Sequence, residues 1–272
     1  MRKIKTYVKN LMLHALRDKG FVCEWTPAAG RDPKHRLGFE TEFMVAYLAY
    51  RRPRAQFVVI GANDGRLLDP VYPFSQKHDW AGVLLEPHPA TYAALVANHP
   101  DGERFRCLQA AIDHKSGART LYHFDVDGLA DRTSLIASFD RGHIEKHQKW
   151  LTHKMRTKGL PANESSHRIM ATEVPCLTYG EVLAKLPRPE EPLDLVVIDV
   201  EGFDAEVVSM LDLKGDKRPL MVVYEKKHCA PVDQERAALI LTRAGYRIAF
   251  NEYDGIAVDV ERLPMLVSSE EE

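Results

Sequence analysis

The chain alternates between short apolar runs and longer segments in which apolar residues recur at helical spacing. Apolar runs rich in β-branched residues lie at residues 57–60, 193–200 and 220–224. Runs without polar alternation are typical of strands that are covered on both faces, as in a parallel sheet. Helical segments between such strands imply right-handed crossovers. The pattern therefore predicts an α/β fold with a doubly wound, mostly parallel sheet.

The other expected elements fit the same alternation. Further strands are expected at residues 81–87, 105–112, 119–124 and 169–177, with a closing antiparallel pair at 246–250 and 256–260. Helices are expected at residues 38–50, 69–78, 90–98, 179–186, 203–213 and 234–244. Asp69 and Pro70 suit the N-cap and the first position of the helix at 69–78. Residues 125–166 break the alternation, and their His, Lys and Arg residues predict a helical insertion above the sheet.

The pattern also predicts how the chain divides. A helical appendage is expected at residues 1–56, one α/β domain at residues 57–262, and a tail at residues 263–272. Residues 1–19 predict a basic amphipathic helix, which either packs on the domain, as we expect, or rests weakly on an anionic membrane surface. No stable membrane insertion is expected, because no apolar run approaches the length of a membrane span.

Composition adds little beyond the class of protein. The 272 residues are 45% hydrophobic and 28% charged, as in ordinary soluble globular proteins. The formal net charge of -2 gives no reason to expect nucleic acid as a partner. The four cysteines are scattered without a CxxC pair, which indicates reduced thiols and a cytoplasmic enzyme. The sequence does not indicate an oligomeric state.

A glycine-containing turn follows the first apolar run directly. It consists of Gly61, Ala62, Asn63, Asp64 and Gly65. Glycines permit positive φ and let a ligand approach the bare backbone. The spacing is neither GxGxxG nor GxxxxGK[ST], which disfavours a dinucleotide fingerprint and a P-loop. The turn is either a binding place for a nucleotide-like ligand or an ordinary connection between a strand and a helix.

Acidic residues end three of the expected strands. Glu86, Asp199 and Glu225 should lie with the glycine turn at the carboxyl edge of the sheet, where ligands bind in doubly wound folds. Glu86 lies a little over 20 residues beyond the turn, where an acid can bind ribose hydroxyls. The alternative is a charged strand end in water, and its position favours the ribose role. Asp199 could face a cation, accept a proton or bind a metal, or it could cap the helix that follows.

These segments together resemble the FkbM family of S-adenosylmethionine-dependent methyltransferases. The resemblance rests on VVIGANDG at residues 58–65, LLEP at 84–87, ASFD at 137–140, VIDVEGFD at 197–204 and EKKH at 225–228. It implies a Rossmann-like class I methyltransferase fold with S-adenosylmethionine as cofactor. It also implies an O-methyltransferase, since family members commonly methylate hydroxyls of glycans or natural products.

The resemblance implies roles for particular residues. Gly61 to Gly65 would hold the methionine part of the cofactor, Glu86 its ribose, and Ala111 with Ile112 its adenine. Many methyltransferases have an acid two residues before the first motif glycine. This chain has Val59 there, so Asp64 or Asp199 would contact the methionine amino group. The candidates for binding the acceptor are Ser138, Asp140, His143 and Glu225.

The expected chemistry is simple. Methyl transfer is an in-line displacement in which the cofactor carries the reactive group, and a hydroxyl acceptor also needs a base. The candidate bases are Asp199, Glu201, His147 and His228. Asp199, Glu201, Glu225 and His228 could also ligate a divalent ion, but no linear spacing demands one, so we expect no metal.

Two other functions fit an α/β sheet of this kind. One is a nicotinamide-dependent oxidoreductase, which the spacing of the glycine turn and the absence of a Tyr-x-x-x-Lys pair disfavour. The other is a non-catalytic cofactor-binding module, which the retained acids disfavour. The expected partner is a small-molecule or glycan acceptor.

Overall fold

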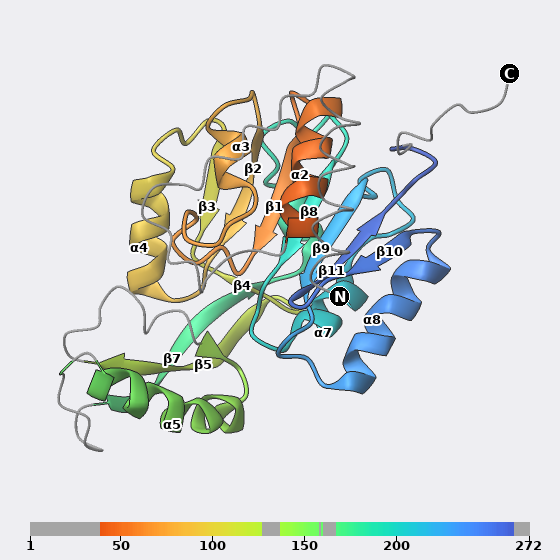
Figure 1. Ribbon diagram of the computed structural model, residues 1–272. Helices are drawn as coiled ribbons and strands as arrows, with labels where there is room; N and C mark the ends of the chain where they lie inside the picture. Colours follow the sequence, from red (N-terminus) through yellow and green to blue (C-terminus); the bar gives the residue numbers. More distant parts are fainter. Residues whose placement is uncertain (1–38, 127–136, 158, 160–166, 264–272) are drawn as a thin grey trace, which may run out of the picture.

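The computed structural model describes residues 39–126, 137–157, 159 and 167–263 (Figure 1). The expected helix at residues 1–19 and all but the first residue of the expected tail lie outside the described residues. No helix among those described is long and apolar enough to cross a membrane. The division of the chain at residue 56 remains a prediction.

The main sheet has the expected architecture. In chain order its strands are β1 (Gln56–Ile60), β2 (Ala81–Leu85), β3 (Phe105–Leu108), β8 (Leu195–Ile198), β9 (Met221–Glu225), β10 (Arg247–Phe250) and β11 (Asp254–Val258). Their order across the sheet is β10, β11, β9, β8, β1, β2, β3. Strand β11 runs opposite to the other six and pairs antiparallel with β9 and β10, so the predicted doubly wound, mostly parallel sheet is confirmed.

Helices cover both faces of this sheet. They are α2 (Phe39–Arg51), α4 (Pro89–Asn98), α6 (Tyr179–Leu183), α7 (Asp204–Met210) and α8 (Pro231–Arg243). Val58 and Ile60 of β1 pack with residues of α6, α7 and α8, whereas Phe57 and Val59 pack with residues of α2 and α4. Each such buried side chain contributes about 1.5–3 kcal/mol. Burial on both faces explains why β1 shows no polar alternation.

The strand register brings separate parts of the chain to one edge. Ile60 aligns with Leu85 of β2 and Ile198 of β8, and Ile198 aligns with Tyr224 of β9. Since these strands are parallel, their carboxyl ends lie side by side. The residues brought together there are Gly61, Glu86, Asp199 and Glu225.

A second sheet replaces the simple helical insertion that the sequence predicted. Its strands are β4 (Ala111–Ile112), β5 (Gly117–Val126), β6 (Ala137–Ser138) and β7 (His167–Leu177), in the order β4, β7, β5, β6. Helix α5 (Arg141–Thr157) packs on it through Ile144, Leu151 and Met155. Sheet and helix lie at the lower left of Figure 1. The predicted helix therefore exists, but a long antiparallel β5–β7 pair supports it.

Two predicted elements differ more from the structure than the others, whose bounds shift by a few residues. The strand expected at residues 105–112 is split into β3 and β4, because the N–H of Ala110 donates back to the carbonyl of Leu108 (3.0 Å) and β4 pairs with β7. The helix expected at 69–78 is a single turn, α3 (Tyr72–Ser75), with Val71 as its N-cap. The Asp69 carboxylate accepts from the N–H of Val71 (2.7 Å), which makes a turn before the helix and does not cap it.

Candidate functional site

The glycine turn joins the ends of three strands. Gly61 has φ +81°, and a Cβ there would collide with the backbone carbonyl of Asp199, so the position requires glycine. The N–H groups of Gly61 and Ala62 both donate to the carbonyl of Leu85, at 3.0 and 2.8 Å. The turn after β1 is thereby fixed against the ends of β2 and β8.

Helix α4 holds the second half of the turn. The Asn98 side chain donates to the carbonyl of Asp64 (2.8 Å), and His99 Nε2 lies 2.9 Å from the carbonyl of Gly65. The Asp64 carboxylate accepts from the N–H of Leu67 (2.7 Å), so it stabilises its own loop. Asn98 and His99 were missed from the sequence, because nothing in the motif shows what packs beneath it.

Glu86 lies where the sequence placed it, beside the turn. Only 7% of the residue is exposed. Its Oε2 accepts from the N–H of Asn63 (3.0 Å) and its Oε1 from the N–H of His88 (2.8 Å). Burial raises the pKa of Glu86 to about 7, although these two backbone N–H groups act in the opposite direction. The N–H of Glu86 donates to the carbonyl of Leu108 (3.1 Å), which ends the strand leading toward Ala111 and Ile112.

The loop after β8 has an unusual backbone. Glu201 has φ +53° and Gly202 φ +95°. The fully buried Asp204 supports this loop by accepting from the N–H groups of Val200 (3.3 Å) and Gly202 (3.1 Å). Burial, and then the Glu225 carboxylate, hold the pKa of Asp204 well above its usual range. The sequence assigned no role to Asp204, although it ends the VIDVEGFD motif.

Asp199 does not cap helix α7, because the N-cap of that helix is Phe203. The Asp199 side chain reaches water, but the surrounding protein removes much of its hydration. This desolvation, and then the nearby carboxylates of Glu225, Glu201 and Asp204, raise the pKa of Asp199 well above its usual range. A group of neighbouring carboxylates favours a bound cation.

His228 lies between two glutamates. Its Nδ1 is 3.0 Å from Glu201 Oε2 and 3.0 Å from Glu225 Oε2. The carboxylates of Glu201 and Glu225 raise the pKa of His228 to about 10, against a smaller opposite effect of burial. In this arrangement, with no cation bound, the two carboxylates favour the protonated form of His228.

Two further histidines approach from helix α5. The ring of His143 lies 4.7 Å from that of His147 and 6.2 Å from that of His228, and His147 lies 5.9 Å from His228, as distances between ring centres. His147 Nδ1 is 2.9 Å from the carbonyl of His143. Because a carbonyl only accepts, Nδ1 carries the proton in this bond and Nε2 of the neutral ring keeps its lone pair. The structure thus brings three of the predicted histidines together.

Ser138 and Asp140 shape the start of α5. Ser138 Oγ accepts from the N–H of Asp140 (3.2 Å), and Asp140 Oδ1 accepts from the N–H of Gly142 (2.8 Å). This segment is tied to the main domain by Arg119, whose guanidinium carbon lies 4.0 Å from the ring centre of Phe139 and 5.5 Å from that of Phe203. Arg119 could not be found from the sequence, because its partners come from distant segments.

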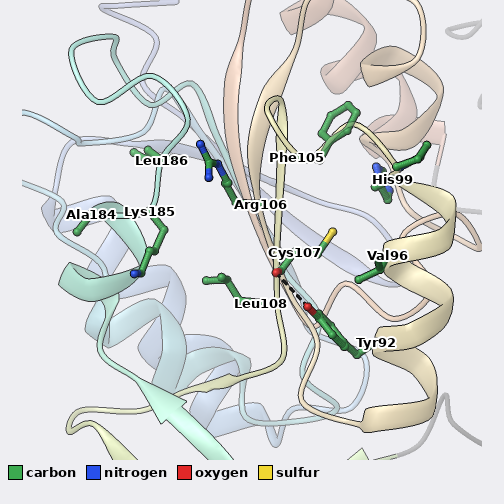
Figure 2. A pocket seen from close by; sticks show the side chains of 12 residues that line it. Tyr92, Val96, His99, Phe105, Arg106, Cys107, Leu108, Ala184, Lys185 and Leu186 are labelled. Carbon is green, nitrogen blue, oxygen red and sulfur yellow. Dashed lines mark hydrogen bonds between the residues drawn. The ribbon is translucent and has the colours of Figure 1, made fainter.

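A cleft of about 570 Å³ lies elsewhere, beside the edge strand β3 (Figure 2). Figure 2 shows Tyr92 and Val96 of α4 on one side of it and Lys185 on the other. The residues lining it include none of the predicted site residues. The predicted site residues gather at the carboxyl edge of the sheet and not in this cleft.

The strand order, the single antiparallel strand β11, the glycine turn after β1 and the acid after β2 define the class I methyltransferase fold. The sequence profile of the FkbM methyltransferase domain matches residues 60–248, and the chain belongs to this family. It is therefore a methyltransferase with S-adenosylmethionine as methyl donor. The family sets aside the oxidoreductase and the non-catalytic module.

Solved structures with a similar fold are distant. They include the FkbM methyltransferase from Methylobacillus flagellatus (10% identity, TM-score 0.41), with 78% of this chain and 47% of that chain covered. Another is precorrin-6y C5,15-methyltransferase from Geobacter metallireducens (12% identity, TM-score 0.41), with 84% of this chain and 92% of that chain covered. A third is the fibrillarin pre-rRNA processing protein of Methanococcus jannaschii (10% identity, TM-score 0.36), with 76% of this chain and 66% of that chain covered. The match thus spans about half the length of the FkbM structure. The search of curated proteins found no relative.

Proposed function

We propose that this methyltransferase acts on a hydroxyl of a sugar, glycan or natural product. The observation that carries the proposal is the meeting of two groups of residues at one sheet edge. The glycine turn and Glu86 form one group, and the histidines and glutamates around His228 form the other. Asp199 belongs to both, because Gly61 packs on its backbone while its carboxylate faces Glu201 and Glu225.

The residues on the turn side fit S-adenosylmethionine, which supplies an electrophilic methyl group. Glu86 is fixed by two backbone N–H groups and has further lone pairs that suit ribose hydroxyls. Asp199 suits the positive charge of the methionine part, since the Asp64 carboxylate is engaged in its own loop. Ala111 and Ile112 follow the strand that bonds to Glu86 and suit the adenine. We expect Glu86→Ala to lower cofactor affinity at least tenfold in calorimetry, because bonds to a charged acceptor are worth about 1.5–3 kcal/mol each.

The residues on the histidine side suit a hydroxyl-bearing acceptor. His147 can accept the hydroxyl proton at Nε2, because its Nδ1 is engaged with the carbonyl of His143. Glu225 and His143 come from opposite sides of this place, and Ser138 and Asp140 position the start of α5. The acceptor oxygen needs to be held about 3–3.5 Å from the methyl carbon in line with the sulfur, so these residues orient as well as deprotonate. We keep the expectation of a cytoplasmic enzyme without a nucleic-acid partner.

The test uses S-adenosylmethionine labelled in its methyl group and a panel of sugar nucleotides, oligosaccharides and hydroxylated natural products. We expect label in a product that resists mild base, as a methyl ether does and a methyl ester does not. His147→Ala should abolish most of the transfer. Label confined to amines or to base-labile esters would contradict the hydroxyl assignment.

A further inference from the structure

Three metal-binding atoms converge at the edge of the candidate site. One ligand atom each of Glu201, Glu225 and His228 lie within 4.8 Å of one another. His228 Nδ1 is 3.0 Å from an oxygen of either glutamate. Two neighbouring ligands of an octahedral ion with bonds of about 2.1 Å are about 3.0 Å apart. The spacing therefore suits ligands that share one ion.

Hydrogen bonding alone does not satisfy this cluster. His228 Nδ1 can donate one hydrogen, and it bonds Glu225 Oε2. Among the described residues, Glu201 Oε2 is a buried atom without a hydrogen-bond partner, and so is His143 Nε2. These two atoms face each other at 4.0 Å. A buried carboxylate oxygen and a buried imidazole nitrogen without partners point to a ligand between them.

We propose that Glu201, Glu225 and His228 bind one divalent cation, which replaces the proton on His228 Nδ1, with His143 beside it as a further donor. Carboxylates suit Mn²⁺ and Mg²⁺, whereas imidazole suits transition metals such as Zn²⁺. Mn²⁺ accepts both kinds of donor, so it is the probe that best fits this mixed set. Linear spacing did not reveal the site, because Glu201 and Glu225 follow different strands.

The cation would have a direct use in methyl transfer, a step that rests on the proposed function. A metal ion lowers the pKa of an oxygen that it binds and orients that oxygen. A hydroxyl acceptor bound to the ion would lose its proton more readily to His147. The cation thus selects acceptors that offer one or two hydroxyl oxygens as ligands.

Binding is tested without any acceptor. Mn²⁺ is titrated into the full chain, previously treated with chelator, and followed by electron paramagnetic resonance and calorimetry. We expect one saturable site, and at least tenfold weaker binding in Glu201→Gln and in Glu225→Gln. Glu235→Gln, on the exposed face of α8, should bind as the wild type does. Mn²⁺ should broaden the ring NMR signals of His228 and His143 before that of the exposed His153.

The results separate this site from the proposed function. Absence of saturable Mn²⁺ binding up to about 1 mM would overturn the site, as would variants that bind like the wild type. Calorimetry with S-adenosylmethionine checks that each variant still binds the cofactor as the wild type does. Methyl transfer that stops in EDTA and returns with Mn²⁺ supports a role of the cation in catalysis. Methyl transfer that persists in EDTA contradicts that role and supports the metal-independent reaction expected from the sequence. Mn²⁺ binding without methylation of any hydroxyl would leave the site standing and contradict the acceptor class.

Discussion

The two halves of the candidate site are built in different ways. On the cofactor side, the polar contacts run between the backbone and single side chains, as in the N–H groups of Asn63 and His88 that hold Glu86. On the acceptor side, side chains from α5 and from the loops after β8 and β9 meet one another. The first half is fixed wherever the strands form. The second half is complete only when the insertion lies against the sheet edge, because His143 and His147 come from α5.

This difference separates what each half contributes. Backbone contacts around Gly61 give a rigid place for a ligand part that never changes, the cofactor. Side chains such as His143 and His147 are carried by one helix, so a few substitutions or a small shift of that helix alter what is bound. We therefore expect substitutions in the cofactor half to change the affinity for S-adenosylmethionine, and substitutions in the acceptor half to change kcat or KM for the acceptor.

The largest expected effect lies in the acceptor half. His147→Ala should lower kcat about 10²–10⁴-fold, because it removes the lone pair that accepts the hydroxyl proton. Steady-state kinetics with a hydroxyl acceptor measure this, and calorimetry should show unchanged affinity for S-adenosylmethionine. The matched control is His153→Ala on the same helix, whose side chain is exposed and which should act like the wild type. A raised KM with normal kcat would instead make His147 a positioning residue.

The next effect lies in the cofactor half and concerns folding. Gly61→Ala should destabilise the protein by more than about 1 kcal/mol, because φ is +81° and the added Cβ would collide with the Asp199 carbonyl. Denaturant unfolding gives this value, and cofactor affinity should fall with it. Gly102→Ala is the control, since a Cβ there meets no atom within 4 Å. Equal stability of the two variants would show that the turn after β1 can move away.

The same contrast explains what the sequence could predict. Glu86 and the glycine turn belong to local patterns, a strand end and a βα connection, whose geometry follows from the residues themselves. The pairing of His228 with Glu225 was visible as a three-residue spacing. Its contact with Glu201 was not, because the two lie on loops that meet only through the β8–β9 register.

The second sheet was missed for a similar reason. Strands β5 and β7 pair across the insertion, from Gly117 with Cys176 to Val126 with His167. Strand periodicity at residues 169–177 was seen, but periodicity does not name a partner strand. The helix α5 was expected from the His, Lys and Arg residues of this segment, whereas the apolar residues that pack it on the second sheet, Ile144, Leu151 and Met155, were not used.

The pH dependence of stability tests whether burial raises the pKa of Glu86. Its pKa is about 7 in the folded protein against an ordinary 4.5, so the folded state binds more protons between these values. Stability contributed by this group is therefore present at low pH and is lost as pH rises from 4.5 to about 7. The loss approaches about 3 kcal/mol. Urea unfolding at several pH values measures it.

Other buried carboxyl groups with raised pKa values also lower stability as pH rises. The contribution of Glu86 is therefore measured as the difference between variants. Glu86→Gln keeps a neutral side chain at every pH, so the free energy of unfolding should fall less steeply with pH than in the wild type. Glu103→Gln, at an exposed position, should keep the wild-type slope. Identical curves for Glu86→Gln and the wild type would mean that the two backbone N–H groups keep Glu86 ionised.

The smallest expected effect comes from the contact that joins the insertion to the loop after β8. Arg119 lies over Phe139, next to the start of α5, and over Phe203, next to the loop after β8. Arg119→Met keeps much of the apolar contact but removes the charge, a cation–π loss of about 0.5–1 kcal/mol. The acceptor KM should then rise about two- to fivefold. Cofactor affinity should change less, because the hydrogen bonds described for the turn and for Glu86 do not involve Arg119. Arg119→Lys tests whether charge alone suffices. If Arg119→Met weakened cofactor and acceptor binding equally, the two halves would be coupled, and the cofactor side would depend on the insertion after all.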